Sequence, residues 1–243
     1  MNFLNIFYYL WRTWFWVTIL LGLLLFSPIT LIFLSFEKTY WLFHLFCKWW
    51  CRLVLLLNGF WYNVKYELEH SEACIICPNH TSKLDIVLLF ATFPGTFIFV
   101  GKEGLTNNPF FEWFYNKTMI TFKRGSVSSA YKAYRKSDRL LKKGISIVVF
   151  PEGGVPNPPC RLQKFKRGAF KLAIDNQIPI LPVSFIDNKI KYPEDLLTLK
   201  LGCLRVIYHT LITTKGLKSN DLNNIKNQTF NIIDNTLIQY ENK

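Results

Sequence analysis

The sequence predicts an α/β fold with a mainly parallel sheet covered by helices on both faces, preceded by an N-terminal two-helix membrane-associated motif. Residues 14–36 form an uncharged apolar run, which is long enough to cross the hydrocarbon core of a bilayer. From residue 73 onward, short apolar runs alternate with helical patterns, as in parallel sheets buried on both faces. We therefore expect a membrane-embedded helical motif over residues 1–62 and an α/β domain over residues 63–243.

The composition favours a membrane-associated protein with an anionic partner. Half of the 243 residues are hydrophobic and 17% are aromatic, which is high for a soluble enzyme and low for a polytopic membrane protein. The net charge is +13, yet Arg12 is the only charged residue before Glu37. A basic body joined to an uncharged apolar head favours a membrane surface, a phosphorylated substrate or nucleic acid as the partner.

The first 60 residues are expected to form two membrane-embedded helices. Pro28 lies inside the uncharged run and is expected to kink or break its helix. The second apolar stretch, residues 39–64, is rich in aromatic residues and interrupted by Lys48 and Arg52, a composition typical of a helix that lies in the membrane interface. The first helix could span the bilayer or enter one leaflet, and two core helices of a soluble protein are the alternative.

After residue 66 the pattern changes to alternating strands and helices. Strands are predicted over residues 73–79, 96–102, 119–125, 145–154, 178–185 and 203–212. Helices are predicted over residues 83–93, 107–115, 126–144 and 166–177, with a closing helix from Asn220.

Polar residues follow four successive predicted strands. They are Asn79-His80 after the first, Lys102-Glu103 after the second, Lys123-Arg124 after the third and Glu152 after the fourth. In parallel α/β sheets the carboxyl ends of the strands meet at one edge, where ligands bind. This recurrence predicts an active site at that edge.

The segment NHTSKLD, residues 79–85, is compatible with two roles. Ser82 and Asp85 fit a capping box, in which a hydroxyl begins a helix and an acid three residues later reaches back. That arrangement does not explain His80 in the preceding loop. A carboxylate in the first helical turn could fix one imidazole nitrogen and leave the other free to act as a base. From the spacing alone capping and catalysis are equally supported, and one segment can do both.

Two further features point to an anion or a polyol. FPEGG, residues 150–154, is either a solvated surface turn or a carboxylate beside backbone N–H groups that suit a polyol or a phosphate. The basic clusters FKRG, residues 122–125, and KFKRG, residues 164–168, precede predicted helices. Because cations oppose the dipole at a helix N-terminus, their placement favours a bound anion unless they are simply solvated.

Several kinds of chemistry are disfavoured. The sequence contains no G-x-S-x-G elbow, no G-x-x-x-x-G-K-[ST] loop and no G-x-G-x-x-G motif, so a covalent acyl-enzyme is not expected, with Ser82 left open as a nucleophile. Cys74 and Cys77 would project to opposite faces of a strand, and no second C-x-x-C completes a zinc site. We expect buried, reduced cysteines in a domain that faces the cytoplasm.

Four blocks in this order resemble the glycerolipid acyltransferase family. NHTSKLD matches an N-H-x-x-x-x-D block, MITFKRG resembles a second block ending in Arg, FPEGG resembles F-P-E-G, and IPILPVSF resembles a fourth block with a central Pro. The resemblance covers roughly residues 40–212 and is nearest to the type that acylates 1-acyl-sn-glycerol-3-phosphate to phosphatidic acid. It implies an enzyme of phospholipid biosynthesis at the membrane, with no nucleic-acid partner.

The resemblance also implies a role for each matching residue. His80 would be the general base that deprotonates the free hydroxyl of a lysophospholipid, and Asp85 would orient it. The hydroxyl would attack the thioester of acyl-CoA or acyl-carrier protein directly, with no metal or redox cofactor. Lys102 and Arg124 would hold the acceptor phosphate, Glu152 and Gly153 the glycerol, and Pro182 would shape the pocket. The implied substrate-binding residues are Asn79, Ser82, Lys102, Arg124, Glu152, Gly153, Lys164 and Pro182.

One block departs from the family pattern. F-P-E-G usually continues with T-R-S, whereas Gly154 and Val155 stand where the Thr and the Arg are expected. Arg161, Lys164 or Lys166 could replace the missing cation, or the acceptor could be a lyso-lipid with another head group, for example a lyso-aminolipid. A membrane-tethered polyanion-binding protein and an ester hydrolase that uses water as the acceptor are the alternatives from other classes.

Overall fold

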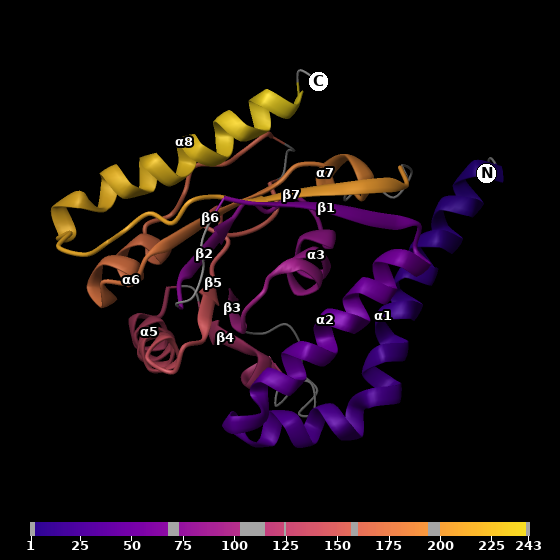
Figure 1. The fold of residues 1–243 in the computed structure, drawn as a ribbon, viewed down its shortest axis with the longest axis horizontal. Helices are drawn as coiled ribbons and strands as arrows, with labels where there is room; N and C mark the ends of the chain where they lie inside the picture. Colours follow the sequence, from indigo (N-terminus) through magenta and orange to yellow (C-terminus); the bar gives the residue numbers. More distant parts are fainter. Residues whose placement is uncertain are drawn as a thin grey trace. The chain divides into compact units, whose positions relative to one another are not determined.

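The computed structural model describes residues 3–67, 73–102, 115–123, 125–156, 160–193 and 200–241. Its α-helices (Figure 1) are α1 Phe3–Ser35, α2 Tyr40–Leu57, α3 Leu84–Thr92, α5 Val127–Leu141, α6 Gly168–Asn176, α7 Asn188–Lys191 and α8 Leu222–Glu241. Two short 3-10 helices are η1 Glu37–Thr39 and η2 Ser219–Asp221. The strands are β1 Phe60–Tyr66, β2 Ile75–Pro78, β3 Phe97–Lys102, β4 Met119–Phe122, β5 Ser146–Val148, β6 Ile180–Phe185 and β7 Gly202–Tyr208.

In the described part of the chain, seven strands form one sheet in the order β1-β7-β6-β2-β5-β3-β4. β2 pairs in parallel with β5 and β6, and β3 pairs in parallel with β4 and β5. β7 runs antiparallel to β6. Along the backbone hydrogen bonds that join the two strands, the residue numbers rise in one strand as they fall in the other. A mostly parallel sheet flanked by helices confirms the predicted fold class.

The central strands are the most deeply buried. β2, β5 and β6 are buried at every position, as expected of strands covered on both faces. Pro182 lies inside β6 although Pro cannot donate to a sheet ladder. Its carbonyl oxygen accepts the His209 N–H at 3.1 Å, so this Pro still contributes an acceptor to the sheet.

The chain divides into two compact units that interleave along the sequence. The first comprises Met1–Lys65, Thr81–Pro94 and Phe185–Val206, and the second comprises Tyr66–His80, Gly95–Ser184 and Ile207–Lys243. Each unit is made of several separate segments, so the two units do not test where a contiguous sequence domain begins or ends. The division predicted at residue 62 therefore stays a prediction.

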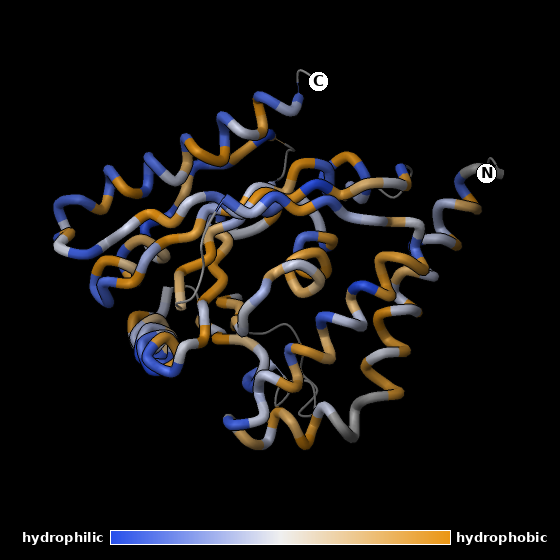
Figure 2. The backbone as a smooth tube through the Cα atoms, in the orientation of Figure 1, coloured by the Kyte–Doolittle hydropathy of each residue, from blue (hydrophilic) through white to orange (hydrophobic). Residues whose placement is uncertain are grey.

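α1 and α2 pack against each other within the first unit and are hydrophobic along most of their length (Figure 2). Within the described residues, Asn5–Leu25 and Tyr40–Leu57 are long and apolar enough to cross a membrane, and only 22% and 28% of them are buried. Signal sequences and the core helices of soluble proteins can be equally long and apolar, but core helices are mostly buried. The exposure of these apolar side chains therefore favours membrane association.

Two parts of the first unit can be compared with the sequence-based expectations: α1 around Pro28 and the end of the second apolar stretch. α1 continues through Pro28 instead of ending there, and its axis changes direction in the last third of the helix (Figure 1), as expected of a helical Pro. The prediction that the second apolar stretch is helical throughout is wrong at its end, because β1 begins at Phe60. Burial alternates along most of β1, and this two-residue period is the signal that identifies a strand.

The helices of the second unit agree with the predicted boundaries. The Ser126 hydroxyl accepts the Ser129 N–H at 3.2 Å and begins α5, and Gly144 follows the end of α5 with a φ of 78°. α5 packs on β4 and β5, and α8 packs on α6. The closing helix buries Leu222, Ile225, Thr229, Ile233 and Leu237. The helix predicted at 107–115 lies, except for its last residue, outside the described residues.

Candidate active site

The carboxyl ends of β2 and β5 bring two of the predicted motifs together in the second unit. β2 and β5 are adjacent parallel strands, with Ile76 opposite Val148. Asn79-His80 and the FPEGG turn at 150–154 therefore start from the same edge of the sheet. Parallel α/β proteins bind their ligands at this edge.

His80 makes two contacts with the FPEGG turn. Its backbone N–H donates to Oε1 of Glu152 at 2.7 Å. Its imidazole stacks on the Phe150 ring, with the ring centroids 3.9 Å apart and the ring planes 21° apart. Phe150 stacks in turn on Phe99 of β3. The half-buried imidazole thus lies against an aromatic wall that restricts its rotation.

Glu152 joins the His80 loop to the segment that follows FPEGG. Its side chain is buried, and while Oε1 accepts the His80 N–H, Oε2 accepts the Gln163 N–H at 2.8 Å. Hydrogen bonds to a charged acceptor are about twice as strong as those between neutral groups. The residue expected to contact the glycerol of the substrate therefore holds the main chain of His80 in place.

Asp85 belongs to the first unit, where it is fully buried in the first turn of α3. Its Oδ2 accepts the backbone N–H groups of Thr81 at 2.7 Å and Ser82 at 2.9 Å. Its Oδ1 accepts a hydrogen bond of 2.7 Å from Nδ2 of Asn188 in α7. These bonds fix the turn that leads into α3. Asn188 lies 103 residues further along the chain, and no local pattern identifies it as a partner.

The capping box predicted for Ser82 and Asp85 forms only in part. Asp85 reaches back to the Ser82 N–H as predicted, but α3 begins at Leu84 and Lys83 occupies the N-cap position. The buried Ser82 hydroxyl donates to the Tyr192 carbonyl at 2.6 Å and accepts the Leu84 N–H at 3.3 Å. Local spacing identified the acid, whereas the distant Tyr192 carbonyl decided where the hydroxyl points.

The remaining predicted substrate-binding residues have varied surroundings. Asn79 is fully buried, and its N–H donates to the Val183 carbonyl at 3.3 Å. Lys102 ends β3, but its side chain and the whole of Arg124 lie outside the described residues. Lys164 is exposed in the segment before α6.

Comparison with known proteins identifies the family. The family model described as Acyltransferase matches residues 62–186, which is half of the chain. The chain belongs to the acyltransferase family. A Caenorhabditis elegans protein provisionally named a 1-acyl-sn-glycerol-3-phosphate acyltransferase is 31% identical over 90% of this chain and 77% of its own length. The 1-acyl-sn-glycerol-3-phosphate acyltransferase alpha of Bos taurus is 28% identical over 70% of this chain and 62% of its own length.

A solved structure shares the fold of this acyltransferase. The crystal structure of the 1-acyl-sn-glycerophosphate acyltransferase PlsC from Thermotoga maritima matches it with a TM-score of 0.79 and 20% sequence identity. The match covers 99% of this chain and 98% of that chain. At this identity the likeness establishes the fold, and the family assignment rests on the sequence matches.

The acyltransferase uses Arg161 to hold its C-terminal helix. Nε of Arg161 donates to Oδ1 of Asp234 at 2.7 Å, and Nη1 lies 3.4 Å from Oε2 of Glu241. Both carboxylates belong to α8. Arg161 was one of three cations predicted to replace the missing Arg of the third block, and these two carboxylates now occupy its guanidinium.

A hydrogen-bonded series of three polar side chains in the acyltransferase was not predicted from the sequence. Ser184 Oγ lies 2.9 Å from His209 Nε2, and His209 Nδ1 lies 3.0 Å from Oε2 of Glu67. The order of hydroxyl, imidazole and carboxylate is that of a hydrolase triad. Ser184, however, is 0% exposed within β6, so its hydroxyl has no access to a substrate. We assign these three residues a structural role that links β6 to the ends of β7 and β1.

The cysteines of the C-x-x-C segment are buried in or next to β2. Burial raises the pKa of the Cys74 thiol to about 12 and raises the pKa of the Cys77 thiol as well. Since the thiolate is the form that attacks disulfides and binds metals, neither side chain is reactive at neutral pH. Their interpretation as small buried hydrophobic residues is confirmed. Among the described residues, no cluster of His, Cys, Asp and Glu is arranged to hold a metal ion.

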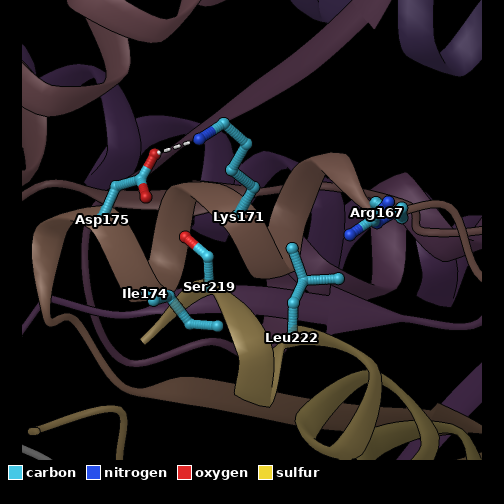
Figure 3. A pocket seen from close by; sticks show the side chains of 6 residues that line it. All are labelled: Arg167, Lys171, Ile174, Asp175, Ser219 and Leu222. Carbon is cyan, nitrogen blue, oxygen red and sulfur yellow. Dashed lines mark hydrogen bonds and ion pairs between the residues drawn. The ribbon is translucent and has the colours of Figure 1, made fainter. Parts of the chain in front are cut away.

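A cavity of about 380 Å³ lies beside α6 and the start of α8 (Figure 3). Its lining residues are Arg167, Lys171, Ile174, Asp175, Ser219 and Leu222. Lys171 turns toward Asp175 and donates to its carboxylate at 2.8 Å. None of the predicted site residues lines this cavity, so the cavity does not mark the predicted site.

Proposed function

We propose that the protein transfers a fatty acyl group from a thioester donor to the free hydroxyl of a lysophospholipid at a membrane. The acceptor we propose is 1-acyl-sn-glycerol-3-phosphate, and the product is then phosphatidic acid. The observation that carries the proposal is His80, which Glu152 and Phe150 hold at the carboxyl edge of the sheet in a chain of the acyltransferase family. The acceptor class follows from the names of the relatives.

His80 is the general base in this proposal. One imidazole nitrogen takes the proton of the acceptor hydroxyl while the hydroxyl oxygen attacks the carbonyl carbon of the thioester. The new C–O bond forms, the C–S bond breaks, and the proton passes to the departing thiolate to give a free thiol. Because the acceptor attacks the donor directly, no acyl group becomes attached to the protein.

Asp85 is proposed to orient the His80 imidazole and to stabilise the imidazolium that forms, as the carboxylate of a triad does. Its position five residues after His80 and its complete burial support this role. The donor is proposed to be acyl-CoA or acyl-carrier protein. The thioester is already activated toward attack by a hydroxyl, so the proposed reaction needs no metal or redox cofactor.

The apolar helices α1 and α2 support a location at the membrane, where lipid substrates reside. We propose that the rest of the chain faces the cytoplasm, because reduced cysteines and thioester donors belong to that compartment. The net charge of +13 suits both an anionic membrane surface and a phosphorylated acceptor.

The proposal is tested with membranes that contain the protein. They are incubated with lysophosphatidic acid and either acyl-CoA or acyl-carrier protein, and free thiol and lipid products are followed together. We expect thiol release that depends on the lyso-lipid and that is lost in His80→Ala. Equal accumulation of the variant in membranes is the control for folding.

Each contrary result has a defined meaning. Normal turnover in His80→Ala would rule out the proposed base. Thiol release at an unchanged rate without lyso-lipid would show a hydrolase, and transfer only to lyso-lipids with other head groups would replace the proposed acceptor. No thiol release with any lyso-lipid, together with binding to polyanions, would support a polyanion-binding protein.

A further inference from the structure

Lys166 lies across the FPEGG turn, and Val155 directly after that turn stands where the family pattern has an Arg. A Cβ built on Gly153 would overlap the Lys166 ammonium and would lie 3.0 Å from Cδ of the same side chain. The backbone N–H of Lys166 donates to the Pro151 carbonyl at 2.8 Å. The main chain of Lys166 is therefore hydrogen-bonded to this turn, and its side chain lies close to Gly153.

Gly153 makes this close approach possible. Its φ is 82°, a conformation that residues with a Cβ rarely adopt. The absence of a Cβ also leaves the space that the Lys166 side chain occupies. A single Gly thus serves the shape of the turn and the position of the cation.

The residue before Lys166 directs its side chain outward. Phe165 is buried and packs on Phe170 of α6 and Phe230 of α8, with ring centroids 6.2 Å and 5.2 Å away. With Phe165 anchored inward, Lys166 is exposed. Its ammonium can therefore meet a dissolved or membrane-bound anion.

The cations near the turn differ in what they contact. The two carboxylates of α8 pair with Arg161. Among the described residues, none of the ion pairs involves Lys166. Of the three cations that could replace the missing Arg, Lys166 is the one that the described structure shows over Gly153.

We propose that Lys166 binds the phosphate of the acceptor lysophospholipid and so replaces the missing Arg, an inference that rests on the proposed function. The same FPEGG turn holds His80 through Glu152, so the proposed base and the proposed phosphate ligand share one support. A charge-assisted bond from an ammonium to a phosphate is among the stronger polar contacts. The acceptor is accordingly a phosphate-bearing lyso-lipid and not a lyso-aminolipid.

The test compares three variants in membranes with equal amounts of protein. Lys166→Met keeps the length of the side chain but removes its charge, Lys166→Arg keeps the charge, and Lys215→Met removes an exposed cation elsewhere. The KM for lysophosphatidic acid is measured at saturating donor, and the KM for the donor at saturating acceptor. We expect Lys166→Met to raise the acceptor KM roughly 10- to 100-fold, as for the loss of a charged hydrogen bond. Lys166→Arg is expected to raise the acceptor KM less than Lys166→Met does, because it keeps the positive charge. The donor KM of each variant, and both KM values of Lys215→Met, are expected to stay close to those of the unmodified protein.

Three results would overturn the assignment. One is an unchanged acceptor KM in Lys166→Met. Another is a raised donor KM with an unchanged acceptor KM, which would assign Lys166 to the phosphates of the donor. The third is an equal loss of kcat in the Met and Arg variants, which would indicate a packing role. Failure of the unmodified protein to release thiol with any lyso-lipid would refute the proposed function itself, and is recognised before the variants are compared.

Discussion

Glu152 shows at the scale of one residue how a motif position can hold the loop of the proposed base. Its two carboxylate oxygens accept N–H groups from His80 and Gln163, which lie 72 and 11 residues away in the sequence. The side chain is buried, so the bonds are little weakened by competing water. The acid of the F-P-E-G block is thus a support for the loop that presents His80.

This arrangement predicts the kinetic effect of Glu152→Gln. The Gln amide keeps one oxygen that can accept a backbone N–H, but its NH₂ group would face the other backbone N–H, which is also a donor. One of the two hydrogen bonds made by Glu152 is therefore lost. We expect kcat to fall roughly 10- to 100-fold, the range for a charged hydrogen bond to a buried group. The acceptor KM should change little, because misplacing a base affects the reaction step and not substrate binding.

The matched control is Asp175→Asn, which also neutralises a carboxylate but removes an exposed i,i+4 pair with Lys171. It should leave both kinetic constants near those of the unmodified protein. A large rise in acceptor KM with kcat preserved in Glu152→Gln would instead support direct contact between Glu152 and the glycerol of the substrate.

At the scale of elements, α2 does more than provide an apolar surface. Its two cations act on the end of α3: Nε of Arg52 donates to the Ala91 carbonyl at 3.0 Å, and Nζ of Lys48 donates to the Phe93 carbonyl at 3.5 Å. Cations near a helix C-terminus satisfy its last carbonyls and complement its dipole. Because α3 carries Asp85, the second apolar helix also supports the helix that carries the proposed partner of the base.

The contact between α1 and α2 depends on a small residue. A Cβ built on Gly22 would overlap the indole of Trp50, a close approach of the kind that small residues permit between membrane helices. We expect Gly22→Leu to lower the free energy of unfolding by roughly 1–3 kcal/mol through overpacking. A lower thermal midpoint of the protein in detergent would show it.

Leu25→Phe is the control for added bulk on the same helix. Leu25 is 65% exposed, so the larger ring meets lipid or detergent and displaces no neighbour. Its thermal midpoint should match that of the unmodified protein. An equal fall of the thermal midpoint in both variants would mean that added bulk destabilises α1 at any position. An unchanged thermal midpoint in both variants would mean that α1 and α2 do not pack as described.

At the scale of the whole molecule, charge and apolar surface are two separate reasons to bind a membrane. The net charge is +13, and large exposed apolar side chains line α1 and α2, among them Leu10, Leu24, Leu25, Trp49 and Leu56. Electrostatic attraction is screened over about 3 Å at 1 M salt, whereas burial of apolar surface in lipid is not weakened by salt.

This difference predicts the outcome of washing membranes that contain the full chain. The protein should stay in the membrane fraction at 1 M salt and be released by detergent, as followed by immunoblotting of pellet and supernatant. A peripheral basic protein added to the same membranes is the control and should be released by the salt. Release of the acyltransferase by salt alone would mean that charge and not the apolar helices holds it.

The sequence by itself determined the features that depend on neighbouring residues. Alternating apolar runs and helical patterns predicted the α/β fold. The Ser that begins α5 and the Gly that ends it could be predicted from local sequence. The spacing of the motifs singled out His80, Asp85 and Glu152. β1 was missed although Asn58-Gly59 is a strong turn signal, because the apolar and aromatic residues of β1 continue the composition of α2.

Only the tertiary structure decided what these residues contact. The Glu152 bond to His80, the Asn188 bond to Asp85 and the position of Lys166 over Gly153 all join separate segments of the chain. Such partners are chosen by the register of the strands and the packing of side chains, neither of which leaves a trace in local periodicity. For that reason the motifs were predictable, whereas the support of His80 by Glu152 and the choice of Lys166 among the three candidate cations were visible only in the folded chain.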